Sequence, residues 1–452
     1  MSEKESEDGL PAAPGTPLMP WVRPGVVEGL REYVANRYGE AEALEEGPEG
    51  VELTELLLGD ALAGGATDIH LDPRSDGTMA RLRLDGVLMD ALLMAEPLAL
   101  TVRNQVKNLT GLNPLPAQSP QDGHFPMLLG GAPVSVRVTV APVLRGEKLS
   151  LRLLSQPQQP QGLAELGMAP GDLERVERCR HSRVGILAVS GPTGSGKTTT
   201  LYALVRGMET AGSNLVSIED PVESELEQVN QMQVDEPRGV TFPAGLKAML
   251  RLDPDLLILG EIREPESARL AVDAVVSGRR LLCTLHSRDA TASVTTLRNL
   301  GLSSREIATN LLLVISQRLF RRLCPGCTTR EPPTEQEREW YRWVGAEPPE
   351  RVHHAVGCER CHGRGYQGRE GVFEVWELTR DDVALVMDDA DEQTLRRHLG
   401  ERGHRFLLEQ GLRRIRDGVT TVDEIARMGG YELGMAAGDG GERPREPSGG
   451  EA

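Results

Sequence analysis

A glycine-rich segment that ends in lysine and threonine is the first indication of chemistry in this chain. It reads Gly191-Pro192-Thr193-Gly194-Ser195-Gly196-Lys197-Thr198 and is followed by Thr199. The pattern is G-x-x-x-x-G-K-[ST], in which backbone N–H groups at a helix N-terminus bind phosphate. In such loops the lysine pairs with the β and γ phosphates and the threonine hydroxyl ligates Mg²⁺. An apolar run precedes the segment and a helical run follows it, so these residues predict an ATP and Mg²⁺ site rather than a chance glycine-rich turn.

Acidic residues follow two other apolar runs. Glu261 ends the run that starts at Asp255, and we expect its carboxylate to lie beside Mg²⁺. Glu219, Asp220 and Glu223 follow a second run, at the end of a strand where open α/β sheets bind ligands. One of these three carboxylates is a candidate general base for water. The alternative is a solvated loop charge or a helix cap, which is the commoner fate of a single carboxylate.

One histidine lies at the end of a further apolar run. His286 follows Thr284-Leu285, where an imidazole can hydrogen-bond the γ-phosphate. A lone histidine more often has no such role, so the spacing by itself leaves this open.

Four of the six cysteines form two Cys-x-x-Cys pairs. The pairs are Cys324 with Cys327 and Cys358 with Cys361, which gives the spacing C-x₂-C-x₃₀-C-x₂-C. That spacing is typical of Zn²⁺ bound by four thiolates. A redox role is the alternative, but the pairs lack the strand and helix context of a thioredoxin-like motif. The other two, Cys179 and Cys283, are expected to be packing residues, and His353, His354 and His362 are expected to be bystanders.

Composition limits the class of protein. The chain has 452 residues, 26% charged and 39% hydrophobic, which indicates a globular protein of several domains. The net charge of -18 argues against broad binding to nucleic acid. The acidic N-terminus lacks the pattern of a secretory signal, and no run approaches the ~18 apolar residues that span a bilayer. We therefore expect a cytoplasmic protein that reaches a membrane only through partners.

The candidate residues need a framework to bring them together. Apolar strands at 184–189, 215–218, 256–259 and 281–285 alternate with helical patterns, which predicts a parallel sheet covered by helices. Upstream, a helical pattern at 51–62 and alternating segments at 68–71, 80–84 and 134–140 predict a separate α/β unit.

Several motifs in order resemble one known family. GPTGSGKTTT, SIEDPVE, RLDPDLLILGEIR and CTLHSRDA resemble the secretion ATPase superfamily of type II secretion and type IV pilus systems. The resemblance covers about residues 50 to 430 and implies a homohexamer with nucleotide between a RecA-like domain and a preceding PAS-like domain. It implies that Glu223 is the catalytic base and Glu261 the Walker B carboxylate. It also implies that Arg137 and Arg152 reach the phosphates from the preceding domain.

The expected fold class is α/β, with a PAS-like domain, a RecA-like P-loop NTPase domain whose mostly parallel sheet lies between helices, and a zinc-binding subdomain. The expected parts are a flexible lead at 1–48, the PAS-like domain at 49–155, a linker at 156–164, the ATPase core at 165–320, the tetracysteine subdomain at 321–375, a C-terminal helical subdomain at 376–432 and a disordered tail at 433–452.

The resulting hypothesis is a motor that hydrolyses Mg-ATP to power type II protein secretion or type IV pilus assembly. The resemblance implies inner-membrane platform and cytoplasmic docking proteins as partners, and the cysteines favour the extension type of ATPase. Arg279 stands where the family usually has histidine, and His124 where it usually has arginine. These departures leave a nucleotide-binding scaffold with weak turnover as an alternative. A nucleic-acid translocase is a further alternative, and the acidic charge disfavours it.

Overall fold

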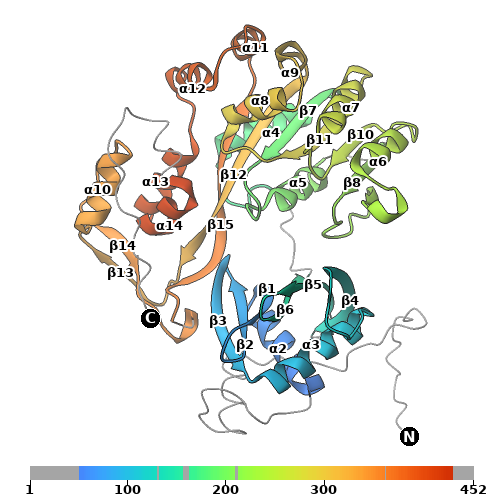
Figure 1. The fold of residues 1–452 in the computed structure, drawn as a ribbon. Coiled ribbons are helices and arrows are strands. Elements are labelled where there is room, and N and C mark those ends of the chain that lie inside the picture. The colour runs from blue at the N-terminus through green and yellow to red at the C-terminus, as the bar shows by residue number, and fades with distance from the viewer. Residues whose placement is uncertain (1–49, 130–131, 156–161, 209–211, 362, 431–452) are drawn as a thin grey trace, which may run out of the picture. The chain divides into compact units, whose positions relative to one another are not determined.

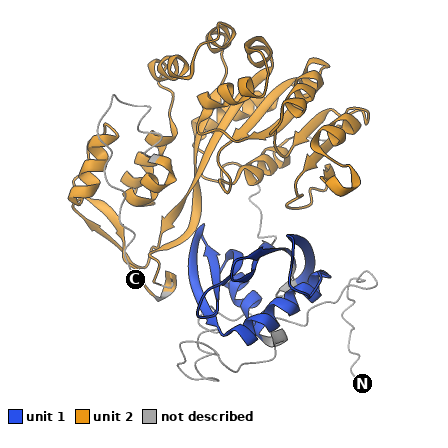
Figure 2. Cartoon of the chain, in the orientation of Figure 1, with its two compact units in different colours: residues 1–158 blue, residues 159–452 orange. Residues whose placement is uncertain are grey.

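The computed structural model describes residues 50–129, 132–155, 162–208, 212–361 and 363–430. The chain divides into two compact units, residues 1–158 and 159–452 (Figure 2). The expected lead at 1–48, most of the expected linker and the expected tail at 433–452 lie outside the described residues.

The first unit is a six-stranded antiparallel sheet in the order β3-β2-β1-β6-β5-β4 (Figure 1). Its strands are β1 (Ala66–Pro73), β2 (Thr78–Leu84), β3 (Val87–Met94), β4 (Gln121–Leu129), β5 (Ala132–Val143) and β6 (Gly146–Ser155). Alternate residues of β2 are buried, as expected of a strand with one face on a core. Helices α2 (Gly50–Ala63) and α3 (Glu96–Thr110) supply the apolar side chains that complete this core.

The second unit is built on a seven-stranded sheet in the order β15-β12-β7-β11-β10-β8-β9. Its strands are β7 (Gly185–Ser190), β8 (Leu215–Glu219), β9 (Asn230–Gln233), β10 (Leu256–Leu259), β11 (Arg280–Leu285), β12 (Leu311–Leu323) and β15 (Tyr366–Glu377). All neighbours are parallel except β12 and β15. Every residue of β7, β8 and β10 is buried, which is why the apolar residues of these strands do not alternate with exposed polar ones. The predicted parallel sheet is confirmed.

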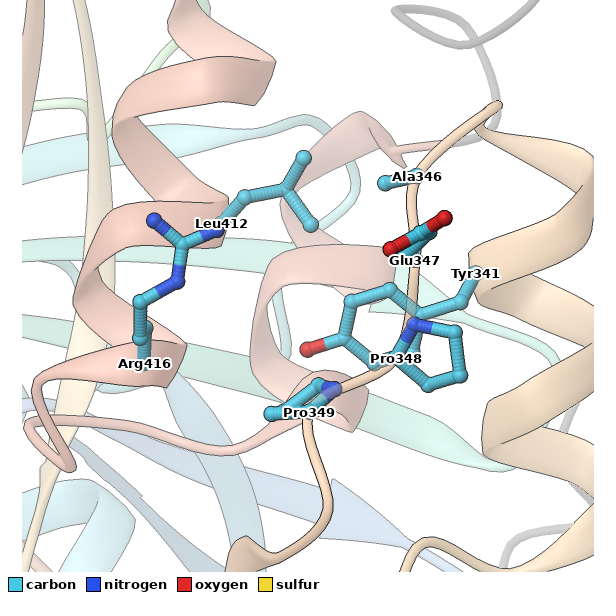
Figure 3. Close-up of a pocket in the computed structure, with 7 residues that line it drawn as sticks. All are labelled: Tyr341, Ala346, Glu347, Pro348, Pro349, Leu412 and Arg416. Atoms are coloured by element: carbon cyan, nitrogen blue, oxygen red, sulfur yellow. The ribbon is translucent and has the colours of Figure 1, made fainter.

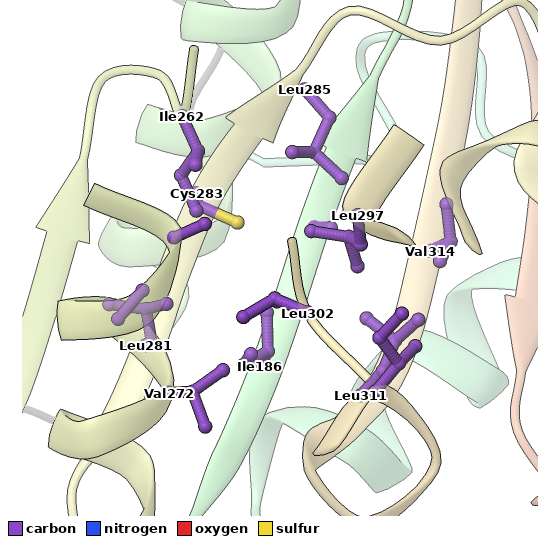
Figure 4. Close-up of a cluster of buried hydrophobic side chains, with 14 of the residues drawn as sticks. Ile186, Ile262, Val272, Leu281, Cys283, Leu285, Leu297, Leu302, Leu311 and Val314 are labelled. Atoms are coloured by element: carbon purple, nitrogen blue, oxygen red, sulfur yellow. The ribbon is translucent and has the colours of Figure 1, made fainter. Parts of the chain in front are cut away.

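Helices cover both faces of this sheet. Ile186 and Ala188 belong to one hydrophobic cluster, whereas Leu187 and Val189 belong to another. Figure 4 shows the first cluster, where Cys283 and Leu285 of β11 pack with Leu297 and Leu302. The covering helices are α4 (Pro170–Arg180), α5 (Lys197–Arg206), α6 (Phe242–Met249), α7 (Pro265–Val276), α8 (Ala290–Asn299) and α9 (Ser304–Asn310).

Strands β12 and β15 flank the segment in which the sequence predicts the tetracysteine subdomain. The expected boundaries at residues 321 and 375 fall inside these two strands, because both belong to the same sheet as β7. The remaining elements are η1 (Glu236–Arg238), β13 (Thr328–Glu331), α10 (Glu335–Trp343), β14 (Val352–Ala355), η2 (Glu359–Cys361), α11 (Arg380–Met387), α12 (Glu392–Glu401), α13 (Leu407–Arg416), α14 (Val422–Ile425) and η3 (Ala426–Gly430). Within the described ranges, none of the helices has the length and apolar character needed to cross a membrane.

Candidate nucleotide and metal sites

The glycine-rich segment forms the turn between β7 and α5. Gly191 has a φ of +152°, and a Cβ there would lie 2.5 Å from both the carbonyl oxygen of Gln317 and Oγ of Ser195. Gly194 and Gly196 have φ values of +77° and +84°, which L side chains rarely adopt. The close approach and the left-handed conformations both require glycine, which explains the three glycines of the predicted phosphate-binding turn.

Lys197, the first residue of α5, folds back over this turn. Its Nζ donates to the carbonyl oxygens of Gly191 at 3.0 Å and Pro192 at 3.1 Å. Burial lowers the pKa of Lys197 to about 8; Glu261 opposes this shift and Arg263 adds to it. The ammonium group therefore lies in a site that favours added negative charge.

Residues of β12 that the sequence analysis did not identify support the same turn. The hydroxyl of Thr200 donates to Oε1 of Gln317 at 2.6 Å, and both side chains are buried. Nη2 of Arg318 donates to the carbonyl oxygen of Arg288, just after His286. The available signal was the polar triplet Ser316-Gln317-Arg318, which interrupts the apolar residues of β12.

Glu261 and His286 lie together at the end of neighbouring strands. Oε2 of Glu261 is 3.2 Å from Nε2 of His286 and 2.6 Å from Nε of Arg263. Glu261 is buried, whereas the His286 and Arg263 side chains are partly exposed. Since β10 and β11 are parallel neighbours, residues that follow them meet at one edge of the sheet. Arg263 was not among the predicted site residues.

The three carboxylates after β8 have different environments. Glu219 is 2% exposed and accepts hydrogen bonds from the Ser217 hydroxyl at 2.7 Å and the Tyr202 hydroxyl. It is enclosed and already has partners, which makes it unsuited to activate water. Asp220 and Glu223 are exposed in the loop that follows.

The two predicted arginines lie in the first unit. Arg137 of β5 and Arg152 of β6 are directly opposite in the antiparallel register. Nε of Arg152 is 3.1 Å from Oδ1 of Asp68, while Arg137 is exposed. The register brings both guanidinium groups to one face of that sheet.

The four predicted cysteines come together near the start of β15. Their Sγ atoms all lie within 4.8 Å of one another, and no other group of this size suited to a metal occurs among the described residues. Cys324 is 3.8 Å from Cys358, and Cys327 is 3.7 Å from Cys361. A tetrahedron with Zn–S bonds of ~2.3 Å has S–S edges of about 3.8 Å. These separations match that geometry, so the four thiols fit zinc.

Backbone groups prepare one of these thiols for metal binding. Burial raises the pKa of Cys361, but N–H groups of Cys358 and Gly365 donate to its sulfur and bring the pKa down to about 6. By contrast, burial raises the pKa of Cys179 to about 11 and that of Cys283 to about 12. These last two thiols lie in the hydrophobic clusters on opposite faces of the seven-stranded sheet.

A separate cavity of about 280 Å³ lies between the end of α10 and α13 (Figure 3). Its lining residues are Tyr341, Ala346, Glu347, Pro348, Pro349, Leu412 and Arg416. None of them belongs to the glycine-rich turn or the cysteine cluster, so this cavity has no part in either site.

Comparison with known proteins gives a consistent picture. The sequence profile of a family described as "Type II/IV secretion system protein" matches residues 44–427. "Type II secretion system protein E" of Pseudomonas aeruginosa is 37% identical over 380 residues, covering 84% of this chain and 75% of that protein. "Type IV pilus assembly ATPase PilB" of Myxococcus xanthus is 34% identical over 405 residues, covering 88% and 71%.

Among solved structures, the Legionella pneumophila ATPase DotB superposes with a TM-score of 0.61 over 85% of this chain and 98% of that one. Its sequence identity is 16%, so this likeness concerns the fold alone.

Proposed function

This chain belongs to the type II/IV secretion system protein family and is an ATP hydrolase, and on that premise we propose that it is a motor for type II protein secretion or type IV pilus assembly. The observation that carries the proposal is the glycine-rich turn with Lys197 folded over it, in the same sheet that presents Glu261 and His286 together.

Lys197 is the proposed partner of the β and γ phosphates. Its ammonium already binds two carbonyl oxygens of the turn and exchanges them for phosphate oxygens, which carry full negative charge. Backbone N–H groups at the start of α5 bind the same phosphates. The residues proposed to contact nucleotide are Gly191, Pro192, Thr193, Gly194, Ser195, Gly196, Lys197, Thr198 and Thr199.

Thr198 and Glu261 are the residues proposed to hold Mg²⁺, through the hydroxyl and the buried carboxylate. Mg²⁺ held by these two residues would supply positive charge beside the phosphates. Glu261 meanwhile keeps His286 at hydrogen-bond distance, which orients the imidazole for a phosphate oxygen.

Glu223 is the proposed general base. Glu219 is enclosed by donors and Glu223 is exposed, so of these two the carboxylate at 223 is the one that water reaches. It accepts the proton of the attacking water as the water oxygen attacks the γ-phosphate.

Arg137 and Arg152 are proposed to bind the nucleotide phosphates from the first unit. Two guanidinium groups directly opposite on neighbouring strands repel each other, and a bound anion removes that cost. Arg152 already forms charge-assisted contacts with Asp68, which hold it in place.

The remaining features complete the proposal. We infer a cytoplasmic homohexamer, peripherally associated with the inner membrane through platform and docking proteins, with zinc bound by Cys324, Cys327, Cys358 and Cys361. No nucleic acid is expected as a partner.

Phosphate release with Mg-ATP tests the nucleotide assignment. Lys197→Ala should abolish turnover, whereas Lys247→Ala, which removes an exposed lysine paired with Glu266, should leave it unchanged. Equal phosphate release by Lys197→Ala and the wild type would overturn the assignment.

A second comparison tests the base and separates a motor from a scaffold. Glu223→Gln should lower kcat roughly 10²- to 10⁴-fold, while Glu225→Gln, exposed two residues further on, should not. Each protein is also run on a sizing column with and without an ATP analogue. A nucleotide-dependent ring without wild-type turnover would indicate the scaffold instead.

A further inference from the structure

Glu219, Tyr202 and Gln231 form a buried polar network that the proposed mechanism does not use. Oε1 of Glu219 accepts from Nε2 of Gln231 at 3.0 Å, and Oε2 accepts from the Tyr202 hydroxyl at 2.5 Å. Glu219 is 2% exposed and Tyr202 1% exposed. Polar groups buried to this extent need hydrogen-bond partners, so the network holds these three side chains in one arrangement.

Tyr202 also contacts the loop that carries Glu223. Its phenol oxygen lies 3.5 Å from Nε2 of Gln231, and the same Nε2 donates to the carbonyl oxygen of Ser224 at 3.1 Å. Burial and the neighbouring Glu219 carboxylate raise the pKa of Tyr202 above its ordinary value, so the hydroxyl stays protonated. The Tyr202 hydroxyl therefore donates to Glu219 and is linked through Gln231 to the residue that follows the proposed base.

Strand β9 holds the same loop at both ends. Oε1 of Gln231 accepts from the N–H of Leu226 at 2.7 Å, and its Nε2 donates to the carbonyl oxygen of Ser224 at 3.1 Å. Oε1 of Gln233 accepts from the N–H of Val222 at 3.2 Å. The backbone on either side of Glu223 is thus fixed while its side chain is exposed.

Tyr202 lies on α5, the helix that begins at Lys197. Its hydroxyl therefore joins the helix that binds phosphate to the loop that supplies the base. A rigid connection of this kind matters, because a displacement of ~1 Å in a reacting group can cost about 10²-fold in rate.

We propose that Tyr202 is a positioning residue for ATP hydrolysis, whose hydroxyl fixes the backbone that carries Glu223 relative to the phosphate-binding turn. This inference rests on the proposed role of Glu223 as the base.

Tyr202→Phe removes only the hydroxyl and tests the inference directly. We expect kcat to fall about tenfold or more, while the Kd for a non-hydrolysable ATP analogue changes less than about twofold. Tyr366→Phe is the matched control, because its buried hydroxyl bonds Thr421 at 2.8 Å, and it should leave kcat unchanged. A kcat for Tyr202→Phe within twofold of the wild type would overturn the inference.

A double variant separates positioning from general damage. In a Glu223→Gln background, Tyr202→Phe should produce no further fall in turnover, since the group that it positions is already gone. A further tenfold fall would mean that Tyr202 acts independently of Glu223.

Gln233→Ala loosens the same loop from an exposed position and should lower kcat without loss of folding. Unchanged kcat in that variant counts against the inference.

Failure of the inference about Tyr202 can be distinguished from failure of the proposed function. Wild-type turnover that depends on Lys197 but not on Tyr202 removes this inference alone. Wild-type protein without Lys197-dependent turnover removes both.

Discussion

The ammonium of Lys197 donates to the carbonyl oxygen of Gly191, the first glycine of the turn that Lys197 itself closes. Lysine and glycine are six residues apart in sequence, and the bond shapes the turn around a cation before nucleotide arrives. The depressed pKa of Lys197, about 8 against an ordinary 10.5, reflects the burial that this arrangement imposes.

The first prediction concerns protons taken up on binding. At pH 8.5 most Lys197 is neutral in the nucleotide-free protein, whereas phosphate favours the charged form, so binding takes up a proton. We expect roughly half a proton or more at pH 8.5, little at pH 7, and an affinity that falls as pH rises through 8. Calorimetry in two buffers of different ionisation enthalpy measures this uptake. Equal uptake by Lys197→Ala would contradict the prediction.

The second prediction concerns the cradle. A Cβ at Gly191 would lie 2.5 Å from a backbone carbonyl oxygen of β12, which cannot move aside without disturbing the strand. Gly191→Ala should therefore weaken binding of an ATP analogue more than about tenfold and lower the melting temperature. Gly278→Ala serves as the control, since Gly278 has a φ of +96° but nothing within 4 Å. It should lower stability by only about 1–2 kcal/mol and leave nucleotide affinity intact.

The third prediction concerns the metal. Fresh protein should contain one zinc per chain, and Cys358→Ser should lose it and unfold at a temperature several degrees lower, because metal binding contributes to folding. Hydrogen exchange should rise in β13 and β14, which lie between the two cysteine pairs. Cys179→Ala, at a thiol outside the cluster, should keep its zinc. Metal analysis that finds well below one zinc in wild-type protein would refute the site.

The fourth prediction concerns the first unit. Nζ of Lys107 donates to Glu147 at 2.6 Å, and the lysine side chain is completely buried. Lys107→Met leaves the carboxylate without its charge partner and should destabilise the unit by about 3–5 kcal/mol. Adding Glu147→Gln should restore part of that loss, as denaturant unfolding of the full chain would reveal. If the losses of stability caused by Lys107→Met and Glu147→Gln simply add, the two side chains do not act as a pair and the prediction is wrong.

The features visible in the sequence were those encoded by short spacings. The glycine-rich turn, the apolar strands on either side of it and the two cysteine pairs are local patterns, and each lies in the structure where its pattern indicated. The acidic and histidine residues after the strands were identified because parallel strands end at one edge.

The features that were missed depend on contacts between distant segments. Gln317 supports the turn because β12 lies beside β7, an order that no local pattern specifies. Tyr202 reads as an ordinary apolar position of α5 until Glu219 is seen beside it. The expected boundaries at 321 and 375 cut through β12 and β15 because the sequence does not reveal that these strands pair.

Leu323 of β12 pairs with Tyr366 of β15. Everything between these two residues, including α10, β13 and β14, is one connection between adjacent antiparallel strands. The two cysteine pairs lie at the two ends of that connection, since Cys324 directly follows β12 and Cys361 shortly precedes β15. The length of this segment can therefore change without altering the register between β12 and β15, which the pairs from Leu313–Glu377 to Arg321–Arg369 set.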